Sequence, residues 1–221
     1  MARIPRVVIE GVAHHVTQRG VRSQQIFWHD DDRKYYLQEL KKQSEIYELD
    51  ILGYCLMFNH VHLIAIPNQK DSLSRAIGET HRLYTRRINF RDGVRGHLFQ
   101  ERFFSCPLDD KHTVSAMRYV ERNPVKAGLQ KFPWDYNWSS AKLHIGEVEK
   151  DILIGLNNWN YPEEEWMMLL KKDPDEIKMI KTSSKTGRPC GDTKFFKECE
   201  RVTSRKLLQQ KSGRKNKSTD K

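Results

Sequence analysis

The hydrophobic and polar positions of the first 125 residues follow two different periods. Apolar runs rich in β-branched residues and ended by Gly or Pro are typical of strands, whereas apolar residues spaced three or four apart are typical of helices. The pattern predicts, in order, strand, helix, strand, strand, helix, strand and helix at residues 12–19, 30–48, 51–57, 60–66, 71–90, 97–108 and 109–123.

This order of elements predicts the fold class. The first six elements match a split β-α-β arrangement, so we expect an α+β protein with a ferredoxin-like sheet. In that arrangement the first two helices pack on one face of the sheet and leave the other face partly open. The third helix is then free to lie over the open face.

Charge divides the chain into three parts. The net charge of the 221 residues is +10. Lys and Arg exceed Asp and Glu by about six in residues 1–145 and by about nine in 181–221, whereas acidic residues exceed basic ones by about five in 146–180. We expect a core, an acidic and partly helical linker, and a basic, partly helical, DNA-binding C-terminal extension that is disordered from Lys211. A basic body with a very basic tail favours a nucleic-acid partner.

Composition argues against several other classes of protein. No apolar run approaches the ~20 residues that span a bilayer, and the N-terminus leads into no signal-peptide segment. The four cysteines are scattered without a CxxC pair, which argues against a zinc ribbon or redox motif. These features favour a reduced, cytoplasmic setting and no membrane partner. The cysteines are Cys55, Cys106, Cys190 and Cys199.

Two histidines in one expected strand form a candidate metal pair. Successive side chains of a strand alternate between faces, so His60 and His62 point to the same side and Val61 to the other. Two imidazoles one pleat apart have the chemistry to bind a single divalent ion. The alternative is two polar residues on the wet face of a half-buried strand.

The end of the third expected helix offers a third ligand and a nucleophile. Tyr119 and Asn123 are four residues apart and share a helix face, and Pro124 places Asn123 at a frayed helix end. The amide oxygen of Asn123 could complete the metal site, with the Tyr119 phenol beside it. That phenol becomes a useful nucleophile if the metal makes the phosphate more electrophilic and local positive charge favours phenolate. The alternative is an ordinary aromatic residue, and by composition Tyr84 is an equal rival.

Several motifs give the chain a family resemblance. HVTQRG at residues 15–20, MFNHVHL at 57–63, YVERNPVKAGL at 119–129 and WSS at 138–140 occur in this order. Together they resemble the HUH single-tyrosine transposases, and most closely the REP-associated tyrosine transposases. TGRPCG at 186–191 and the basic tail resemble the C-terminal part of the same group.

The resemblance implies an HUH endonuclease core and assigns roles to residues. It selects Tyr119 over Tyr84 as the nucleophile and implies Mg²⁺ or Mn²⁺ held by His60, His62 and Asn123. Imidazole ligands favour Mn²⁺ over Mg²⁺. The implied reaction attacks a phosphodiester of single-stranded DNA beside a hairpin of a repeated palindromic element. It leaves a 5′-phosphotyrosine link and a free 3′-hydroxyl. We expect a monomer, with a dimer as the alternative.

Arginines are the candidate DNA contacts. Those of the second helix are spaced along one side and could meet backbone phosphates, and the one between Gly187 and Pro189 could enter a minor groove. The alternatives are a solvated basic face and a plain linker. The candidates are Arg19, Arg82, Arg86, Arg87, Arg91 and Arg188.

Two other functions remain compatible with the sequence. A non-catalytic single-stranded nucleic-acid-binding module on a ferredoxin-like sheet predicts binding that is sensitive to salt, without a covalent adduct or a metal effect. A metallohydrolase that uses water as its nucleophile predicts turnover without a covalent intermediate.

Overall fold

The centre of the molecule is a four-stranded antiparallel sheet. The computed structural model describes residues 5–155, 159 and 161–208. The strand order is β2-β3-β1-β4, the ferredoxin-like order, so the predicted α+β fold is confirmed. The strands are β1 (His14–Arg19), β2 (Leu49–Met57), β3 (His60–Pro67) and β4 (Phe104–Pro107).

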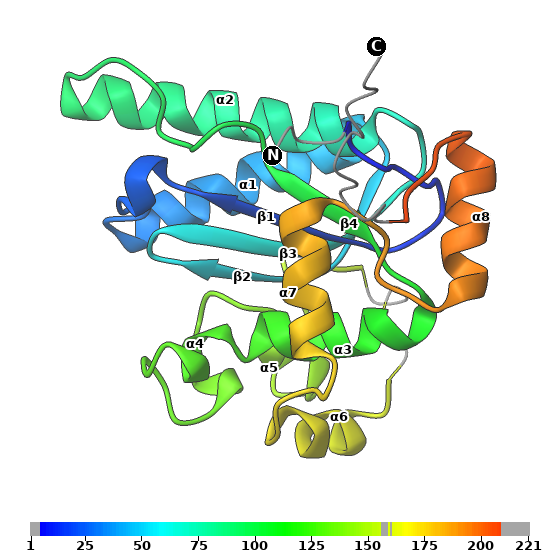
Figure 1. Cartoon of the computed structure of the whole chain (residues 1–221). Coiled ribbons are helices and arrows are strands. Elements are labelled where there is room, and N and C mark those ends of the chain that lie inside the picture. Colours follow the sequence, from blue (N-terminus) through cyan, green and yellow to red (C-terminus); the bar gives the residue numbers. More distant parts are fainter. Residues whose placement is uncertain (1–4, 156–158, 160, 209–221) are drawn as a thin grey trace, which may run out of the picture.

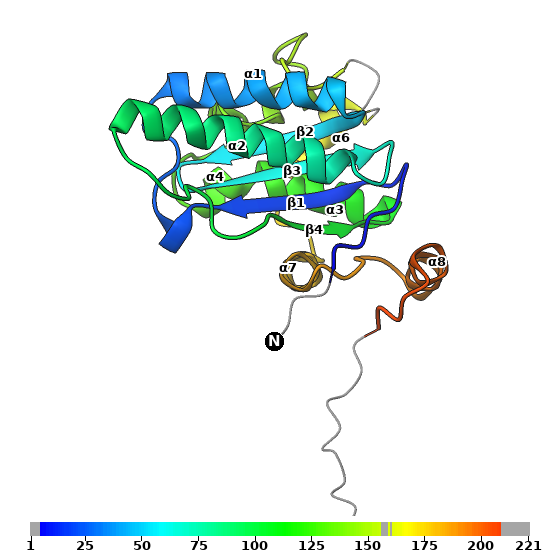
Figure 2. The same ribbon diagram turned by 90° about the horizontal axis from the view of Figure 1, so that it is seen from above.

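Two long helices cover one face of the sheet. Figure 1 shows α1 (Asp30–Ile46) and α2 (Ser72–Asp92) above the strands, and Figure 2 shows them side by side across the sheet. Val61 and Leu63 of β3 are fully buried in the core beneath them. Burying such a side chain contributes about 1.5–3 kcal/mol. These odd-numbered residues anchor β3, and the even-numbered ones face the other side.

The opposite face of the sheet is covered by α3 (Asp110–Glu121) and shorter helices, as expected for the helix left free by the split arrangement. Asp109 caps α3 by accepting a hydrogen bond at 2.8 Å from the main-chain N–H of His112. The further elements are α4 (Asn123–Lys126), α5 (Ala141–His144), α6 (Glu163–Leu170) and the 3-10 turns η1 (Val21–Ser23) and η2 (Pro133–Asp135).

The C-terminal part adds a helix along the edge of the sheet. Helix α7 (Ile177–Thr186) contacts β4, α3 and β1, and Figure 2 shows it beside the β4 edge. Gly187, at φ 71°, ends this helix in the left-handed conformation that glycine tolerates. Helix α8 (Thr193–Thr203) follows. The expected boundary after residue 180 falls inside α7, and the expected disorder from Lys211 lies outside the described residues.

Two predicted elements differ in their bounds. The strand expected over 97–108 is only β4, because Glu101 takes a positive φ of 51° and interrupts the extended backbone. The third helix ends at Glu121, and Asn123 begins α4 instead of fraying. Pro124 has no N–H for the carbonyl of Val120 four residues earlier, and the side-chain amide of Asn123 donates to that carbonyl instead, at 3.3 Å.

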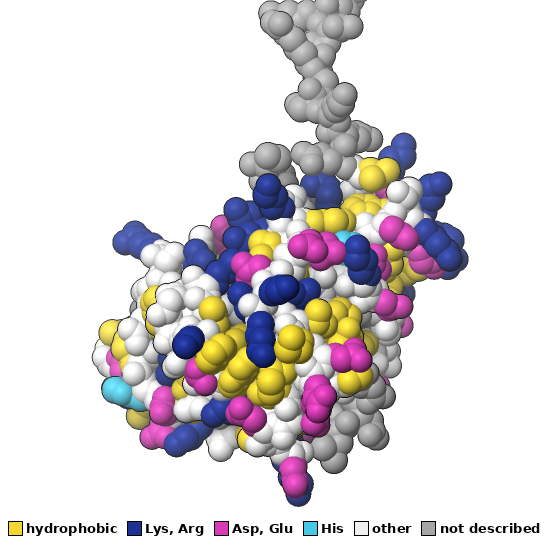
Figure 3. Space-filling model, turned by 90° about the horizontal axis from the view of Figure 1, so that it is seen from below, with side chains coloured by type: hydrophobic (Ala, Val, Ile, Leu, Met, Phe, Trp, Pro, Cys, Tyr) yellow, Lys and Arg dark blue, Asp and Glu magenta, His cyan; other side chains and the backbone are white. Residues whose placement is uncertain are grey.

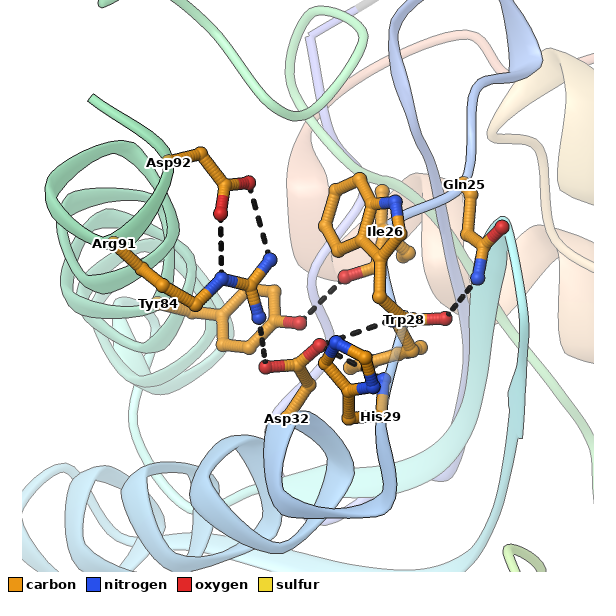
Figure 4. A network of polar contacts seen from close by, with 9 residues as sticks. Gln25, Ile26, Trp28, His29, Asp32, Tyr84, Arg91 and Asp92 are labelled. Carbon is orange, nitrogen blue, oxygen red and sulfur yellow. Dashed lines mark hydrogen bonds and ion pairs between the residues drawn. The ribbon is translucent and has the colours of Figure 1, made fainter. Parts of the chain in front are cut away.

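The N-cap of helix α1 is His29, the residue immediately before Asp30. A carboxylate oxygen of Asp32 accepts the main-chain N–H of His29 at 3.1 Å and that of Trp28 at 2.9 Å (Figure 4). This reciprocal capping fixes the first turn of α1.

The rival tyrosine belongs to the core. Tyr84 is fully buried, and its hydroxyl donates to the carbonyl of Ile26 at 2.5 Å, as Figure 4 shows. Burial raises the pKa of its phenol far above the usual value. A phenol held in this way is a poor nucleophile.

In the described part of the chain, no helix combines the length and the hydrophobicity needed to cross a bilayer.

Candidate functional site

The two histidines of β3 share one face of the sheet. The ring centroids of His60 and His62 lie 4.9 Å apart, and both side chains are on the α3 side. The neighbouring strand β1 places Arg19 opposite His60 and Thr17 opposite His62. The strand period predicted this arrangement from the sequence.

Hydrogen bonds leave the same nitrogen of each ring available. Nδ1 of His60 donates to the side-chain oxygen of Asn59 at 2.6 Å, and Nδ1 of His62 lies 3.0 Å from Nε2 of His15. Nε2 is therefore the nitrogen left for a ligand in both rings. A metal-ligating imidazole usually uses its other nitrogen for such a bond, so the pair fits a divalent ion.

Helix α3 brings the tyrosine to the histidines. The Tyr119 ring packs edge-on against His62, with centroids 5.7 Å apart, and against His15, with centroids 5.8 Å apart. These side chains and Asn123 line one pocket of about 620 Å³ with His60. The structure thus brings together the four residues predicted for catalysis and metal binding.

Asn123 is oriented by its own helix. Its Nδ2 donates to the carbonyl of Tyr119 at 2.8 Å and to that of Val120 at 3.3 Å. The amide oxygen is then the end left for a ligand. Among the described residues, no cluster of three His, Cys, Asp or Glu could hold a metal ion. An amide oxygen as third ligand is compatible with that finding.

A buried carboxylate holds the end of α3 in place. Glu121 is fully buried, and its carboxylate accepts hydrogen bonds from Ser140, His144 and Trp166 at 2.5, 2.6 and 2.9 Å. These donors come from the loop before α5, from α5 and from α6. Because Tyr119 and Asn123 flank Glu121, this network sets where both side chains lie.

Burial controls the charge state of the site. It lowers the pKa of His60 to about 4, aided by Arg19, and the pKa of His62 well below its usual value. Both imidazoles are therefore neutral, as metal ligation requires. Burial also raises the pKa of Tyr119, and Arg19 opposes this only in part. Without DNA or metal, the surroundings of Tyr119 therefore favour phenol over phenolate.

Basic side chains line the rim of the pocket. Arg19 comes from β1, Lys126 from α4, and Lys181 and Lys185 from α7. The Lys126 ammonium lies 5.3 Å from the centroid of the Tyr119 ring. The sequence pointed to Arg19 but missed the three lysines. For Lys181 and Lys185 the reason is that nothing local shows that α7 packs beside β4.

The other predicted DNA-binding arginines lie outside this pocket. Arg82 pairs with Glu79 at 2.8 Å, and the guanidinium of Arg87 lies 4.3 Å above the ring of Tyr35. Arg82 and Arg86 line a second hollow, at the end of α2.

Two further candidates are engaged within the protein. Arg91 pairs with Asp32 at 2.7 Å and with Asp92 at 2.6 Å, as Figure 4 shows. Arg188 donates to the carbonyl of Leu207 at 2.8 Å. A DNA role for these arginines remains a prediction.

The surface on the α6 side of the molecule is less uniformly basic than the rim of the pocket. Figure 3 views the molecule from this side and shows hydrophobic side chains gathered between basic and acidic ones. Two arginines at the C-terminal end of α3 and directly after it make hydrogen bonds and an ion pair within the protein. Arg118 donates to the carbonyls of Leu169 and Lys172, and Arg122 donates to that of Leu170 and pairs with Asp173.

Comparison with known proteins places the chain in a family. The model of the family described as "Transposase IS200 like" matches residues 9–123. A proposed REP-associated tyrosine transposase of Haemophilus influenzae is 25% identical over 111 residues, covering 45% of this chain and 63% of that protein. The chain thus matches less than two thirds of the length of this relative.

One solved structure supports the fold, and a second is a weaker match. A REP-associated tyrosine transposase bound to a REP hairpin matches with a TM-score of 0.57 and 19% identity, covering 73% of this chain and 95% of that one. A proposed transposase of Deinococcus radiodurans matches with a TM-score of 0.39 and 14% identity, covering 55% of this chain and 97% of that one. The family match spans the strands, the histidine pair and the tyrosine helix, and the chain belongs to the IS200-like transposase family.

Proposed function

We propose that this protein is a metal-dependent nuclease and strand transferase that cuts and rejoins single-stranded DNA through Tyr119. The observation that carries the proposal is the packing of the Tyr119 ring against His62, in one pocket with His60 and Asn123. A nucleophile, two neutral imidazoles and an amide oxygen are the parts that a metal-assisted phosphoryl transfer needs.

Each side chain has a role in this chemistry. His60, His62 and Asn123 would hold Mg²⁺ or Mn²⁺, and such an ion supplies Lewis-acid polarisation of the scissile phosphate. Tyr119 attacks phosphorus through its phenol oxygen, losing its proton. The bond from phosphorus to the 3′ oxygen breaks, and that oxygen takes up a proton. One phosphodiester replaces another, so the reverse attack rejoins the strands without a nucleotide cofactor.

The raised pKa of Tyr119 is consistent with this order of events. Burial favours the neutral phenol when no DNA is bound, which limits unproductive attack. Arg19 already acts in the opposite direction, and the ion held by the histidines would add positive charge nearby.

The substrate class follows from the rim and the family. Arg19, Lys126, Lys181 and Lys185 offer positive charge for a DNA backbone at the mouth of the pocket. The solved relative with the same fold was bound to a REP hairpin. We therefore propose a single strand next to a DNA hairpin as the substrate of this chain.

A single gel experiment tests the proposal. The full-length protein is incubated with a single strand that carries a hairpin and a 3′-end label, with Mn²⁺ or with chelator. We expect a labelled covalent protein–DNA adduct that needs the metal and is absent in Tyr119→Phe. Tyr84→Phe is the matched control, since Tyr84 is a core residue and its variant should still form the adduct.

The other outcomes identify the rival functions. Salt-sensitive binding without cleavage or adduct would show a non-catalytic binding module. Cleavage without an adduct would show a hydrolase that uses water. An adduct that survives in Tyr119→Phe would move the nucleophile elsewhere, and one that survives in chelator would exclude the metal.

A further inference from the structure

A series of hydrogen bonds runs from α7 across β1 to a histidine of the site on β3. The hydroxyl of Ser184 lies 2.7 Å from the carbonyl of Ile180 and 2.7 Å from Nδ1 of His15. Nε2 of His15 in turn lies 3.0 Å from Nδ1 of His62. The planes of the His15 and His62 rings are nearly parallel, with an interplanar angle of 10°. Three elements that are distant in sequence are thereby linked.

Counting protons shows which atom donates and which accepts in each of these hydrogen bonds. A serine hydroxyl has one proton, and here it is used on the carbonyl of Ile180, four residues earlier on the same helix. The Ser184 oxygen therefore accepts from Nδ1–H of His15. A neutral imidazole has one donor and one acceptor nitrogen, so Nε2 of His15 accepts from Nδ1–H of His62.

The series of hydrogen bonds ends at the lone pair on Nε2 of His62. With its proton held at Nδ1, His62 presents Nε2 as an acceptor. The opposite direction would require Ser184 to give up its bond to Ile180 and would place a proton on Nε2 of His62. His15 is almost fully buried, so solvent offers no substitute partner for its ring.

We propose that His15 and Ser184 are positioning residues that fix the tautomer and the ring orientation of His62 for metal ligation. This inference rests on the proposed metal-dependent function. It gives α7 a role in the active site, because Ser184 of α7 supplies the hydroxyl that fixes the direction of these hydrogen bonds. We call the series from Ser184 through His15 to His62 the relay. Partners of this kind typically change metal affinity by about 10- to 100-fold.

The first test measures Mn²⁺ affinity of the full-length protein without DNA, by titration calorimetry. We expect the dissociation constant to rise about 10- to 100-fold in His15→Phe and less in Ser184→Ala. Ser184→Thr keeps a hydroxyl that reaches the same carbonyl and should restore wild-type affinity. Adding Ser184→Ala to His15→Phe should have no further effect, because both act through the same bond.

Ser183→Ala is the matched control. Ser183 is the neighbouring buried serine of α7, but its hydroxyl donates to the carbonyl of Pro189 at 3.3 Å. The same substitution on the same helix should leave Mn²⁺ affinity unchanged. An equal loss in Ser183→Ala and Ser184→Ala would indicate general damage to α7 and would overturn the relay.

The second test reads the tautomer without metal. Long-range ¹H–¹⁵N spectra of histidine-labelled protein, assigned with His62→Gln, should show His62 protonated only at Nδ1. Ser184→Ala should produce a mixture of tautomers. A proton on Nε2 of His62 in the wild-type protein would overturn the relay.

The two tests separate the relay from the proposed function. If the wild-type protein binds Mn²⁺ but His15→Phe and Ser184→Ala bind it equally well, the relay is wrong and the metal site stands. If the wild-type protein binds no Mn²⁺, the metal-dependent function is wrong, and the inferred role of His15 and Ser184 is wrong with it.

Discussion

The side-chain amide of Asn123 donates a hydrogen bond to the main-chain carbonyl of Tyr119, with Nδ2 and the oxygen 2.8 Å apart. This bond orients the candidate metal ligand from the same turn of chain that carries the candidate nucleophile. The two functional groups are therefore coupled, and a change at Asn123 should affect both metal binding and catalysis.

Substitutions of Asn123 should separate these two effects. Asn123→Ala removes the oxygen ligand, and we expect cleavage to fall by about 100-fold, equivalent to about 2.7 kcal/mol of barrier. Asn123→Asp supplies a carboxylate ligand but cannot donate to the Tyr119 carbonyl. It should therefore bind Mn²⁺ better than Asn123→Ala while remaining slow in cleavage. Mn²⁺ titration and single-turnover cleavage measure the two quantities.

DNA affinity should change little in these variants if, as we propose, the basic rim makes the phosphate contacts. Asn68→Ala, at an exposed amide bonded to Asp50, is the control. Unaltered cleavage in Asn123→Ala would exclude Asn123 as a ligand.

Glu121 should be important for stability. Glu121→Ala leaves three buried donors without their acceptor, and we expect the free energy of unfolding to fall by about 3–5 kcal/mol. Urea denaturation measures this change. Glu164→Ala, at an exposed glutamate of α6, should change stability by less than about 0.5 kcal/mol. Similar losses in the two variants would contradict the role of the buried network.

The basic rim predicts a salt-dependent contribution to DNA binding. Lys185→Gln should lower the slope of log affinity against log salt concentration by about one, as expected for one lost phosphate contact. Lys42→Gln removes the same charge from α1, on the other face of the sheet, and should leave the slope unchanged. Equal slopes for both variants would place the DNA away from the pocket.

Buried neutral histidines outside the site predict acid lability. Burial lowers the pKa of His14 to about 4 and that of His81 to about 3. In the unfolded chain both titrate near 6.5, so the unfolded state binds more protons as the pH falls below that value. Stability should therefore decrease from about pH 6.5 downward, by up to about 1.4 kcal/mol per pH unit for each histidine.

The interval between pH 6.5 and 5 separates the buried histidines from the carboxylates, because most carboxylates are ionised there in both states. Urea denaturation in chelator measures the slope, and His14→Asn should reduce it by about one proton. The same substitution at the exposed His97 should leave the slope unchanged. A stability that does not depend on pH in this interval would contradict buried neutral histidines.

The local parts of the fold were predictable from the sequence. The alternation around Val61 placed His60 and His62 on one face, and the helical spacing placed Tyr119 near Asn123. Choosing Tyr119 over Tyr84 required the family motifs, because only the fold shows that Tyr84 is buried against Ile26.

The long-range parts were not predictable from local pattern. His15 reaches His62 through the register between β1 and β3, and Ser184 reaches His15 because α7 packs at the β4 edge. Neither the register nor the docking of α7 leaves a periodic signal in the sequence. Conversely, a local pattern can predict a contact that the fold has already used. The regular spacing of arginines in α2 predicted DNA contacts, but Arg91 is already paired with Asp32.

The most direct measurement of the central claim is peptide mapping of the protein–DNA adduct by mass spectrometry. The full-length protein is trapped with a hairpin-bearing single strand and Mn²⁺, digested with nuclease and protease, and searched for a nucleotide attached through a 5′ phosphate. We predict that the modified residue is Tyr119 and that the modification disappears in Tyr119→Phe and in chelator. A nucleotide attached to any other residue, or cleaved DNA with no modified peptide, would contradict the account.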